Sequence, residues 1–252
     1  MNDVEKIINA SPKKMQEMLN SVYTYNSNFV KNEKQEKLLE RIIFAMSAVD
    51  RRFFVSEVKE SYLDTALSIG DGQTISQPST VARMLLLAEL EEGDDVLEIG
   101  TGSGWNACLI AYLVYLGSIV SVERLARLKE RAEKNLSLLK KQLQQKKPEI
   151  YQRLQKINFL AENVFDLAEK KRDIFEKGRV WRRKYNKIIF TAGISNDRTE
   201  GKVEALAKEL LKDEGALVCP YTAGRISVFK KQQDRLKRFT TRESYVFVPL
   251  LD

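Results

Sequence analysis

Three closely spaced glycines between two apolar segments constrain the fold of this chain more than any other feature. Gly100, Gly102 and Gly104 directly follow one apolar segment and precede another. Glycine permits a tight turn and lets a ligand approach the backbone N–H groups at the start of a helix. The sequence therefore predicts a strand at 95–99, a ligand-binding turn, and a helix at 106–116.

Apolar segments on both sides of these glycines alternate in the way that an α/β sheet requires. Further helices are predicted at 80–90, 125–144 and 201–211, and further strands at 118–123, 156–160, 187–191 and 216–220. Two more strands, 225–230 and 244–250, are expected to be antiparallel edge strands because few residues separate them. We predict a Rossmann-like, doubly wound α/β sheet that is mostly parallel, with antiparallel C-terminal edge strands.

The N-terminal part of the chain has a different pattern. Apolar residues recur at spacings of three and four up to about residue 60, which predicts an N-terminal helical cap. Residues 64–78 are rich in Asp, Gly and Pro and are predicted to form an extended loop. The expected division is a helical cap with its loop at 1–78 and a sheet core at 79–252, together one compact unit.

Composition limits the chemistry that is open to this chain. Its 252 residues, 43% of them hydrophobic, can bury a full core. The chain has no histidine, which excludes an imidazole base. Its only two cysteines lie in apolar segments and are assigned to the core. Cys-rich zinc sites are therefore excluded, and no metal is expected. No apolar segment reaches the roughly 18 residues of a membrane helix, and the N-terminus lacks a signal-peptide pattern. We therefore expect a cytoplasmic protein that makes no membrane contact.

The net charge of +7 raises the question of nucleic-acid binding. Residues 140–156 and 168–186 are rich in Lys and Arg and are interpreted as charged insertions in the sheet. A solvated, lysine-rich surface is the favoured interpretation, because Phe175, Trp181 and Tyr185 do not form an RNA-binding signature. Nucleic acid is an open but not a favoured partner.

The spacing of the glycines helps to identify the ligand. A dinucleotide-binding turn has the spacing G-x-G-x-x-G, whereas here the third glycine comes one residue earlier and is followed by the bulky Trp105, so NAD is disfavoured. Glu98, in the strand before the glycines, could receive the cationic amino group of a methionine moiety. Glu123, about 20 residues after the turn, has the placement for a ribose diol.

The segment VLEIGTGSG at 96–104 resembles motif I of class I methyltransferases, and SVER at 121–124 resembles their ribose-binding second motif. This resemblance implies S-adenosyl-L-methionine as the cofactor. LAEN at 160–163 stands where the family often has a Gly-Asp-Gly turn beside the adenine, so its last two residues are either adenine contacts or part of a plain surface turn. The residues expected to bind the cofactor are Gln73, Thr74, Ile75, Glu98, Gly100, Thr101, Gly102, Ser103, Gly104, Asn106, Glu123, Arg124, Glu162 and Asn163.

Three further segments, SAVDRRFFV, YLDTALSIGDGQTISQPSTVARML and the C-terminal YVFVPL, make the resemblance more specific. They are similar to protein-L-isoaspartate O-methyltransferases, and the similarity covers residues 44–133 and returns at 186–193 and 215–220. That family methylates the abnormal carboxylate of L-isoaspartyl residues in damaged proteins. The resemblance implies isoaspartyl-containing proteins or peptides as substrates, a role in protein repair and a substrate loop before residue 79. The chain is expected to be a monomer.

Ser76 matches the family's active-site serine, which implies a hydrogen bond from its hydroxyl to the acceptor carboxylate. Gln73, Thr74 and Ile75 would shape the wall shared by the methyl donor and the acceptor. A carboxylate is ionised at neutral pH and needs no general base, so catalysis would depend mainly on positioning. In the alternative interpretation, Ser76 and Ser79 only cap the next helix.

Departures from the family pattern leave the acceptor open. The loop reads TISQPS where the family usually has TISAPH, the Gly-Asp-Gly turn is absent, and TAGIS at 191–195 stands in place of TAAAP or TAGAP. Isoaspartyl methylation is the main prediction. One alternative is a methyltransferase that acts on another protein carboxylate or on RNA, and the other is a protein that binds S-adenosyl-L-methionine without turnover.

Overall fold

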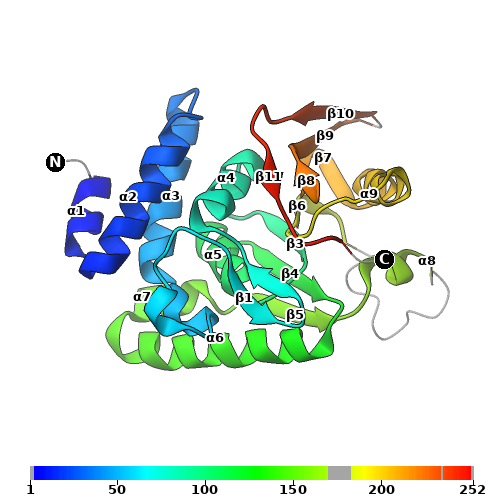
Figure 1. Ribbon diagram of the computed structural model, residues 1–252. Helices are drawn as coiled ribbons and strands as arrows, with labels where there is room; N and C mark the ends of the chain where they lie inside the picture. The colour runs from blue at the N-terminus through cyan, green and yellow to red at the C-terminus, as the bar shows by residue number, and fades with distance from the viewer. Residues whose placement is uncertain (1–2, 170–182, 234, 251–252) are drawn as a thin grey trace.

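A mixed sheet forms the centre of the molecule and carries helices on both faces (Figure 1). The computed structural model describes residues 3–169, 183–233 and 235–250. Within these residues the central sheet has seven strands in the order β10-β9-β7-β6-β3-β4-β5. In chain order they are β3 (Asp95–Ile99), β4 (Ser118–Glu123), β5 (Ile157–Ala161), β6 (Tyr185–Phe190), β7 (Leu211–Pro220), β9 (Ile226–Gln232) and β10 (Arg235–Thr240).

The strand order reverses at β3. The chain runs outward from β3 through β4 to β5 and then returns to β6 on the other side of β3, and these strands and β7 are parallel. β9 and β10 are antiparallel to their neighbours. In open α/β sheets, ligands bind beside the carboxyl ends of the strands at such a reversal. The predicted Rossmann-like, doubly wound fold with antiparallel edge strands is confirmed.

Both faces of the sheet are buried by helices. The helices that follow the N-terminal part are α4 (Pro78–Ala88), α5 (Trp105–Leu113), α6 (Ala126–Lys146), α7 (Pro148–Arg153), α8 (Val164–Glu169) and α9 (Asp197–Leu210). In β3, Val96 belongs to the hydrophobic cluster of α4, α5 and α6, whereas Leu97 and Ile99 belong to that of α9. This strand is therefore apolar on both sides, as expected of a parallel strand inside a sheet.

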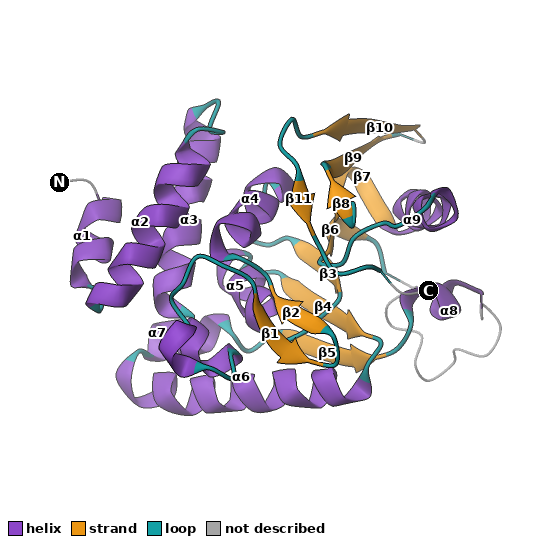
Figure 2. Ribbon diagram, viewed as in Figure 1, coloured by secondary structure: helices purple, strands orange, loops and turns teal. Residues whose placement is uncertain are grey.

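Three N-terminal helices form a further layer outside α4 and α5 (Figure 2). They are α1 (Asp3–Ala10), α2 (Lys13–Ser27) and α3 (Glu33–Ala48), and the short helices η1 (Arg51–Phe54) and η2 (Val58–Glu60) follow them. Asn32 caps α3 by accepting a hydrogen bond from the Gln35 N–H at 3.0 Å. Buried residues of all three helices share one hydrophobic cluster with α4 and α5. The helical cap is present, and its division from the core at residue 78 stays a prediction.

The prediction of an extended loop at 64–78 is wrong in part. β1 (Leu67–Gly70) and β2 (Gln73–Ile75) form an antiparallel hairpin within it. Gly70, Asp71 and Gly72 at its tip have φ of 85°, 56° and 69°, a region that Gly and Asp adopt more readily than most residues. The residues that indicate a loop in the sequence are the turn of this hairpin.

The edge of the sheet also differs from the prediction. β9 lies near one predicted strand and pairs with β7. The edge strand, however, is β10, which was not predicted. Four of the six residues in its sequence RLKRFT are polar or charged, so it has no apolar pattern that would indicate a strand. The predicted strand at 244–250 is reduced to β11 (Tyr245–Val246), which pairs with β8 (Ala223–Gly224) outside the central sheet. Of the two charged segments, 140–156 forms the end of α6 and α7, and 170–182 of the other lies outside the described residues.

Three predictions from composition can be compared with the structure. Cys108 and Cys219 are both buried with free thiols, so their assignment to the core is confirmed. In the described part of the chain, no group of three or more His, Cys, Asp or Glu side chains could hold a metal ion. Within the same residues no helix has the length and apolar character to cross a membrane.

Candidate active site

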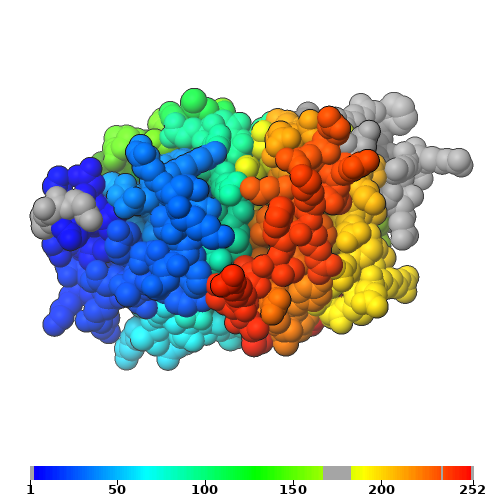
Figure 3. All heavy atoms as spheres, turned by 90° about the horizontal axis from the view of Figure 1, so that it is seen from above, coloured from blue at the N-terminus to red at the C-terminus, as the bar shows by residue number. Residues whose placement is uncertain are grey.

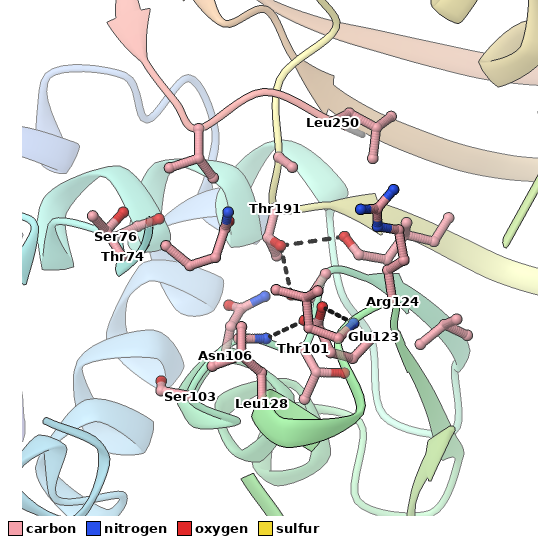
Figure 4. Close-up of a pocket in the computed structure, with 18 of the residues that line it drawn as sticks. Thr74, Ser76, Thr101, Ser103, Asn106, Glu123, Arg124, Leu128, Thr191 and Leu250 are labelled. Atoms are coloured by element: carbon pink, nitrogen blue, oxygen red, sulfur yellow. Dashed lines mark hydrogen bonds between the residues drawn. The ribbon is translucent and has the colours of Figure 1, made fainter. Parts of the chain in front are cut away.

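A cavity lies at the carboxyl ends of β3, β4 and β6, where the strand order reverses. Figure 4 shows Thr74 and Ser76 at one end of it, Arg124 at the other, and Thr191 between them. All predicted site residues except Glu98 and Gly104 line this cavity. Those that do are Gln73, Thr74, Ile75, Ser76, Gly100, Thr101, Gly102, Ser103, Asn106, Glu123, Arg124, Glu162 and Asn163.

The glycine turn forms one wall of the cavity and leaves little room for side chains. A Cβ on Gly100 would lie 2.2 Å from Oγ1 of Thr191, which is too close for any other residue. At Gly102 a Cβ would contact only Cδ1 of Ile69 in the hairpin, at 3.5 Å, but its φ of 53° disfavours residues with a Cβ. Space beside Gly102 is therefore open to a ligand.

Glu123 holds the glycine turn in place from the end of β4. Its buried carboxylate accepts a hydrogen bond from the Gly102 N–H at 2.9 Å through Oε2 and one from the Leu125 N–H at 3.0 Å through Oε1 (Figure 4). Each carboxylate oxygen can accept a further hydrogen bond. Glu123 can thus receive two hydroxyl groups of a ligand while it fixes the turn.

Glu98 lies beneath the cavity and not in its lining. It is fully buried on β3, where Oε1 accepts from Nδ2 of Asn106 at 2.8 Å and Oε2 accepts from the Ser121 hydroxyl. Burial raises the pKa of Glu98 to about 7, although both hydrogen bonds favour the ionised form. The side chain that reaches the cavity is that of Asn106, and Glu98 fixes its orientation.

Glu162 and Asn163 follow β5 and line the cavity. The Glu162 N–H donates to the carbonyl oxygen of Glu123 at 2.9 Å, which joins the ends of β4 and β5. Oδ1 of Asn163 accepts from the Phe165 N–H at 3.0 Å at the start of α8. The two residues belong to a structured turn and also lie on the wall of the cavity.

A second cavity, here called the hydroxyl groove, shares Thr74, Ser76, Thr191 and Val248 with the first. None of its lining residues is charged, and most of the polar ones carry a hydroxyl group. The N-terminal (blue) and C-terminal (red) parts of the chain meet beside each other on the face seen in Figure 3. The other residues of the groove are Tyr25, Thr65, Ala66, Gln77, Thr80, Ser244, Tyr245, Val246 and Phe247.

Ser76 lies where the two cavities join. Among the described residues its hydroxyl has no hydrogen-bond partner, while its carbonyl oxygen accepts from Nη2 of Arg51 at 3.1 Å. Gln77, the residue before α4, makes no capping hydrogen bond with its side chain, and the Ser79 N–H in the first turn donates to Oδ1 of Asp64 at 2.8 Å. Asp64 therefore takes the capping role that the alternative interpretation gave to the serines, and the Ser76 hydroxyl is available to a ligand.

Several residues of the site are absent from the prediction. Thr191 lines both cavities, and its hydroxyl donates to the carbonyl oxygen of Gly100. Val248 and Leu250 of the C-terminal segment line the first cavity. The segments TAGIS and YVFVPL contain these three residues but indicate only the family resemblance. Arg51 contacts the loop before α4 from inside the core, and no signal in the sequence separates it from the neighbouring Arg52.

Comparisons with known proteins show which family this chain belongs to. The model of the family described as protein-L-isoaspartate(D-aspartate) O-methyltransferase matches residues 24–252. The protein-L-isoaspartate O-methyltransferase of Fervidobacterium nodosum is 52% identical over 102 residues, which are 39% of this chain and 51% of that protein. Protein-L-isoaspartate O-methyltransferase 1 of Archaeoglobus fulgidus is 49% identical over 105 residues, which are 40% of this chain and 49% of that protein. The chain spans about half the length of the curated relatives it matches.

Solved structures have the same fold. A Plasmodium falciparum protein assigned as a protein-L-isoaspartate O-methyltransferase, in complex with S-adenosyl-L-homocysteine, matches with a TM-score of 0.65 and 19% identity over 92% of this chain and 97% of that one. Another protein-L-isoaspartate O-methyltransferase matches with a TM-score of 0.64 and 23% identity over 86% of this chain and 66% of that one. Because the family model matches most of its length, this chain belongs to the protein-L-isoaspartate(D-aspartate) O-methyltransferase family.

Proposed function

We propose that this protein transfers a methyl group from S-adenosyl-L-methionine to the free carboxylate of L-isoaspartyl residues in damaged proteins or peptides. The observation that carries this proposal is the position of Ser76. Its hydroxyl has no partner among the described residues and lies where the cavity at the strand reversal meets the hydroxyl groove. Membership of the family supports the same reaction and a role in protein repair.

The first cavity fits the nucleoside part of S-adenosyl-L-methionine. Glu123 can accept hydrogen bonds from both hydroxyl groups of a ribose while it retains its bonds to the turn. The apolar side chains of Val122, Leu125 and Val164 line the same cavity and provide a surface for an adenine ring. Gly102 leaves space for the ligand beside the turn.

The methionine part would bind at Asn106. Nδ2 of Asn106 donates to Glu98, which leaves the amide oxygen to accept a hydrogen bond from an ammonium group. Glu98 would then act through Asn106 and through its buried charge, and not by direct contact as the sequence suggests. When bound, the cofactor supplies an electrophilic methyl group on a sulfonium.

An acceptor carboxylate needs orientation more than activation. Its pKa is near 4, so it is ionised at neutral pH and can attack a methyl group without a general base, and the absence of histidine from the sequence is no obstacle. The Ser76 hydroxyl can donate one hydrogen bond that holds a carboxylate oxygen in line with the methyl group. Apolar groove residues such as Val248 and Phe247 limit the access of water to the reacting atoms.

One assay tests the proposal against its alternatives. Labelled methyl groups from S-adenosyl-L-methionine should appear on an isoaspartyl peptide and not on its aspartyl twin. Equal labelling of the two peptides, or labelling of RNA alone, would replace isoaspartate with another acceptor. Binding of S-adenosyl-L-homocysteine without transfer to any of them would make the chain a binding protein. The cytoplasmic location and the monomeric state stay predictions, and light scattering of the purified protein tests the second.

A further inference from the structure

A buried arginine lies behind the hydroxyl groove. The Arg51 side chain has 0% relative exposure, and no carboxylate among the described residues lies within ion-pair distance of it. Its Nη1 donates to the carbonyl oxygens of Ser61 at 2.9 Å and Leu63 at 3.2 Å. Its Nη2 donates to the carbonyl oxygens of Thr65 at 3.0 Å and Ser76 at 3.1 Å. One guanidinium therefore joins both ends of the loop that contains the hairpin.

The same side chain also contacts the wall of the first cavity. The guanidinium carbon lies 5.3 Å from the ring centroid of Trp105, a cation–π arrangement. Trp105 lines the first cavity, and its Nε1 donates to the carbonyl oxygen of Val49 at 3.0 Å. Arg51 thus lies between the start of α5, beside the first cavity, and the loop that forms the hydroxyl groove.

Arg51 keeps its charge in this environment. Burial lowers its pKa to about 10, and the negative charge of Asp64 acts in the opposite direction. The carboxylate of Asp64 is itself hydrogen-bonded to Ser79 and Ser21. At neutral pH the guanidinium is therefore a cation that carbonyl oxygens solvate, and no directly contacting acid neutralises it.

The hydrogen bonds from Nη2 of Arg51 fix the orientation of two peptide groups in the groove. In a trans peptide, the N–H of the next residue points away from the carbonyl oxygen. Because the carbonyls of Thr65 and Ser76 point at Arg51, the N–H groups of Ala66 and Gln77 point away from it. Both residues line the hydroxyl groove, and neither N–H has an acceptor among the described residues.

We propose that Arg51 is a positioning residue for the acceptor carboxylate. It holds Thr65 and Ser76 so that the Ala66 and Gln77 N–H groups and the Ser76 hydroxyl can bind the carboxylate. Its charge supplies the positive potential that the uncharged lining of the groove lacks. This inference rests on the proposed function, since it needs an anionic acceptor.

Substitution of Arg51 should separate acceptor binding from cofactor binding. In Arg51→Met, which removes the charge and all four hydrogen bonds, the KM for an isoaspartyl peptide should rise at least tenfold. The Kd for S-adenosyl-L-homocysteine should change less than threefold, which also shows that the variant is folded. Arg51→Lys keeps the charge without the planar fork and should give an intermediate KM. Arg52→Met is the matched control, because Arg52 lies in the same short helix, is partly exposed and pairs with Asp50.

Chemical rescue distinguishes a positioning role of Arg51 from a purely structural one, because added guanidinium would not restore activity if Arg51 only stabilised the fold. In Arg51→Ala, millimolar guanidinium chloride should lower the KM for the peptide toward that of the parent, whereas the same concentration of sodium chloride should not. If Arg51→Met does not fold, Arg51→Lys and this rescue decide the matter. A peptide KM within twofold of the parent in the folded variants, or no response to guanidinium, would overturn the inference alone. No transfer by the parent protein would overturn the proposed function, and this inference with it.

Discussion

The side-chain hydroxyl of Thr191 donates a hydrogen bond to the carbonyl oxygen of Gly100 at 2.5 Å and so joins the end of β6 to the glycine turn. Gly100 could not be replaced by a residue with a side chain while Thr191 keeps its position, because a Cβ on Gly100 would occupy the place of the Thr191 hydroxyl. Both residues line the first cavity. This contact therefore sets the shape of the cavity at the point where the strand order reverses.

Thr191→Val should weaken cofactor binding. Valine has nearly the same shape but cannot donate, and one net hydrogen bond is worth about 0.5–1.5 kcal/mol, so the Kd for S-adenosyl-L-homocysteine should rise roughly two- to tenfold. Calorimetry measures the change. Thr191→Ser retains the hydroxyl and should bind like the parent, and equal affinities of the two variants would show that the hydrogen bond is unimportant.

Gly102→Val should abolish cofactor binding and leave the fold intact. A branched residue at φ of 53° is strained, and its side chain would fill the space left for the ligand. Circular dichroism checks the fold, and calorimetry checks binding. Gly201→Ala is the control, since a Cβ there meets nothing within 4 Å and alanine favours the helix by about 1 kcal/mol. A Gly102→Val protein that binds the cofactor like the parent would assign the turn a structural role only.

Ser76→Ala should lower methyl transfer to an isoaspartyl peptide by roughly ten- to a thousandfold, because one positioning hydrogen bond typically controls a few kcal/mol of a barrier. Affinity for S-adenosyl-L-homocysteine should stay nearly unchanged. Single-turnover transfer at saturating cofactor is the measurement. Ser68→Ala, on the exposed part of β1, is the control and should keep full activity. Undiminished transfer by Ser76→Ala would remove this hydroxyl from the mechanism.

Glu98→Gln should change the pH dependence of stability. In the parent, Glu98 ionises near 4.5 in the unfolded chain and at about 7 in the folded protein. Between these values the folded state binds more protons, so this residue lowers stability as pH rises from 4.5 to 7, by roughly 3 kcal/mol in all. Glutamine has the same shape and no titration. Urea unfolding at pH 5 and pH 8 should therefore show a smaller loss for the variant, and parallel losses would contradict the raised pKa.

RNA binding should be weak and should depend strongly on salt. Lys141, Lys146 and Lys147 are exposed at the end of α6 and before α7, where a phosphate backbone could reach them. Counterion release predicts that any binding falls steeply between 50 and 200 mM salt and further on reversal of these charges to Glu. Filter binding measures it. Tight, salt-sensitive binding together with methyl transfer to the RNA would favour the alternative acceptor.

Much of the site could be predicted because its parts are local in the sequence. The strand, the glycine turn and the helix after it follow one another, and Glu123 ends the next strand, so the topology alone brings them together. The sequence predicts the hairpin only as a loop, because its two strands have just four and three residues and turn-forming residues lie between them. β10 has no apolar alternation to reveal it.

The parts that escaped prediction depend on contacts between distant segments. Arg51 and Arg52 are adjacent and chemically alike, yet one is fully buried and the other pairs with Asp50 at the surface. Only the packing of the loop around η1 distinguishes them. Thr191 likewise gains its role from a carbonyl oxygen 91 positions earlier in the chain. Hydrogen bonds of this kind leave no periodic pattern in the sequence.

The uncharged lining of the hydroxyl groove has a consequence for the release of product. Esterification would turn an anion into a neutral group, so in the proposed reaction the attraction of the guanidinium behind the groove would end with the transfer of the methyl group. No side chain of the lining has to move for affinity to fall. We expect the methyl ester of an isoaspartyl peptide to compete for the groove more weakly than the unmodified peptide. The product would then leave the groove after each turnover without a separate conformational step.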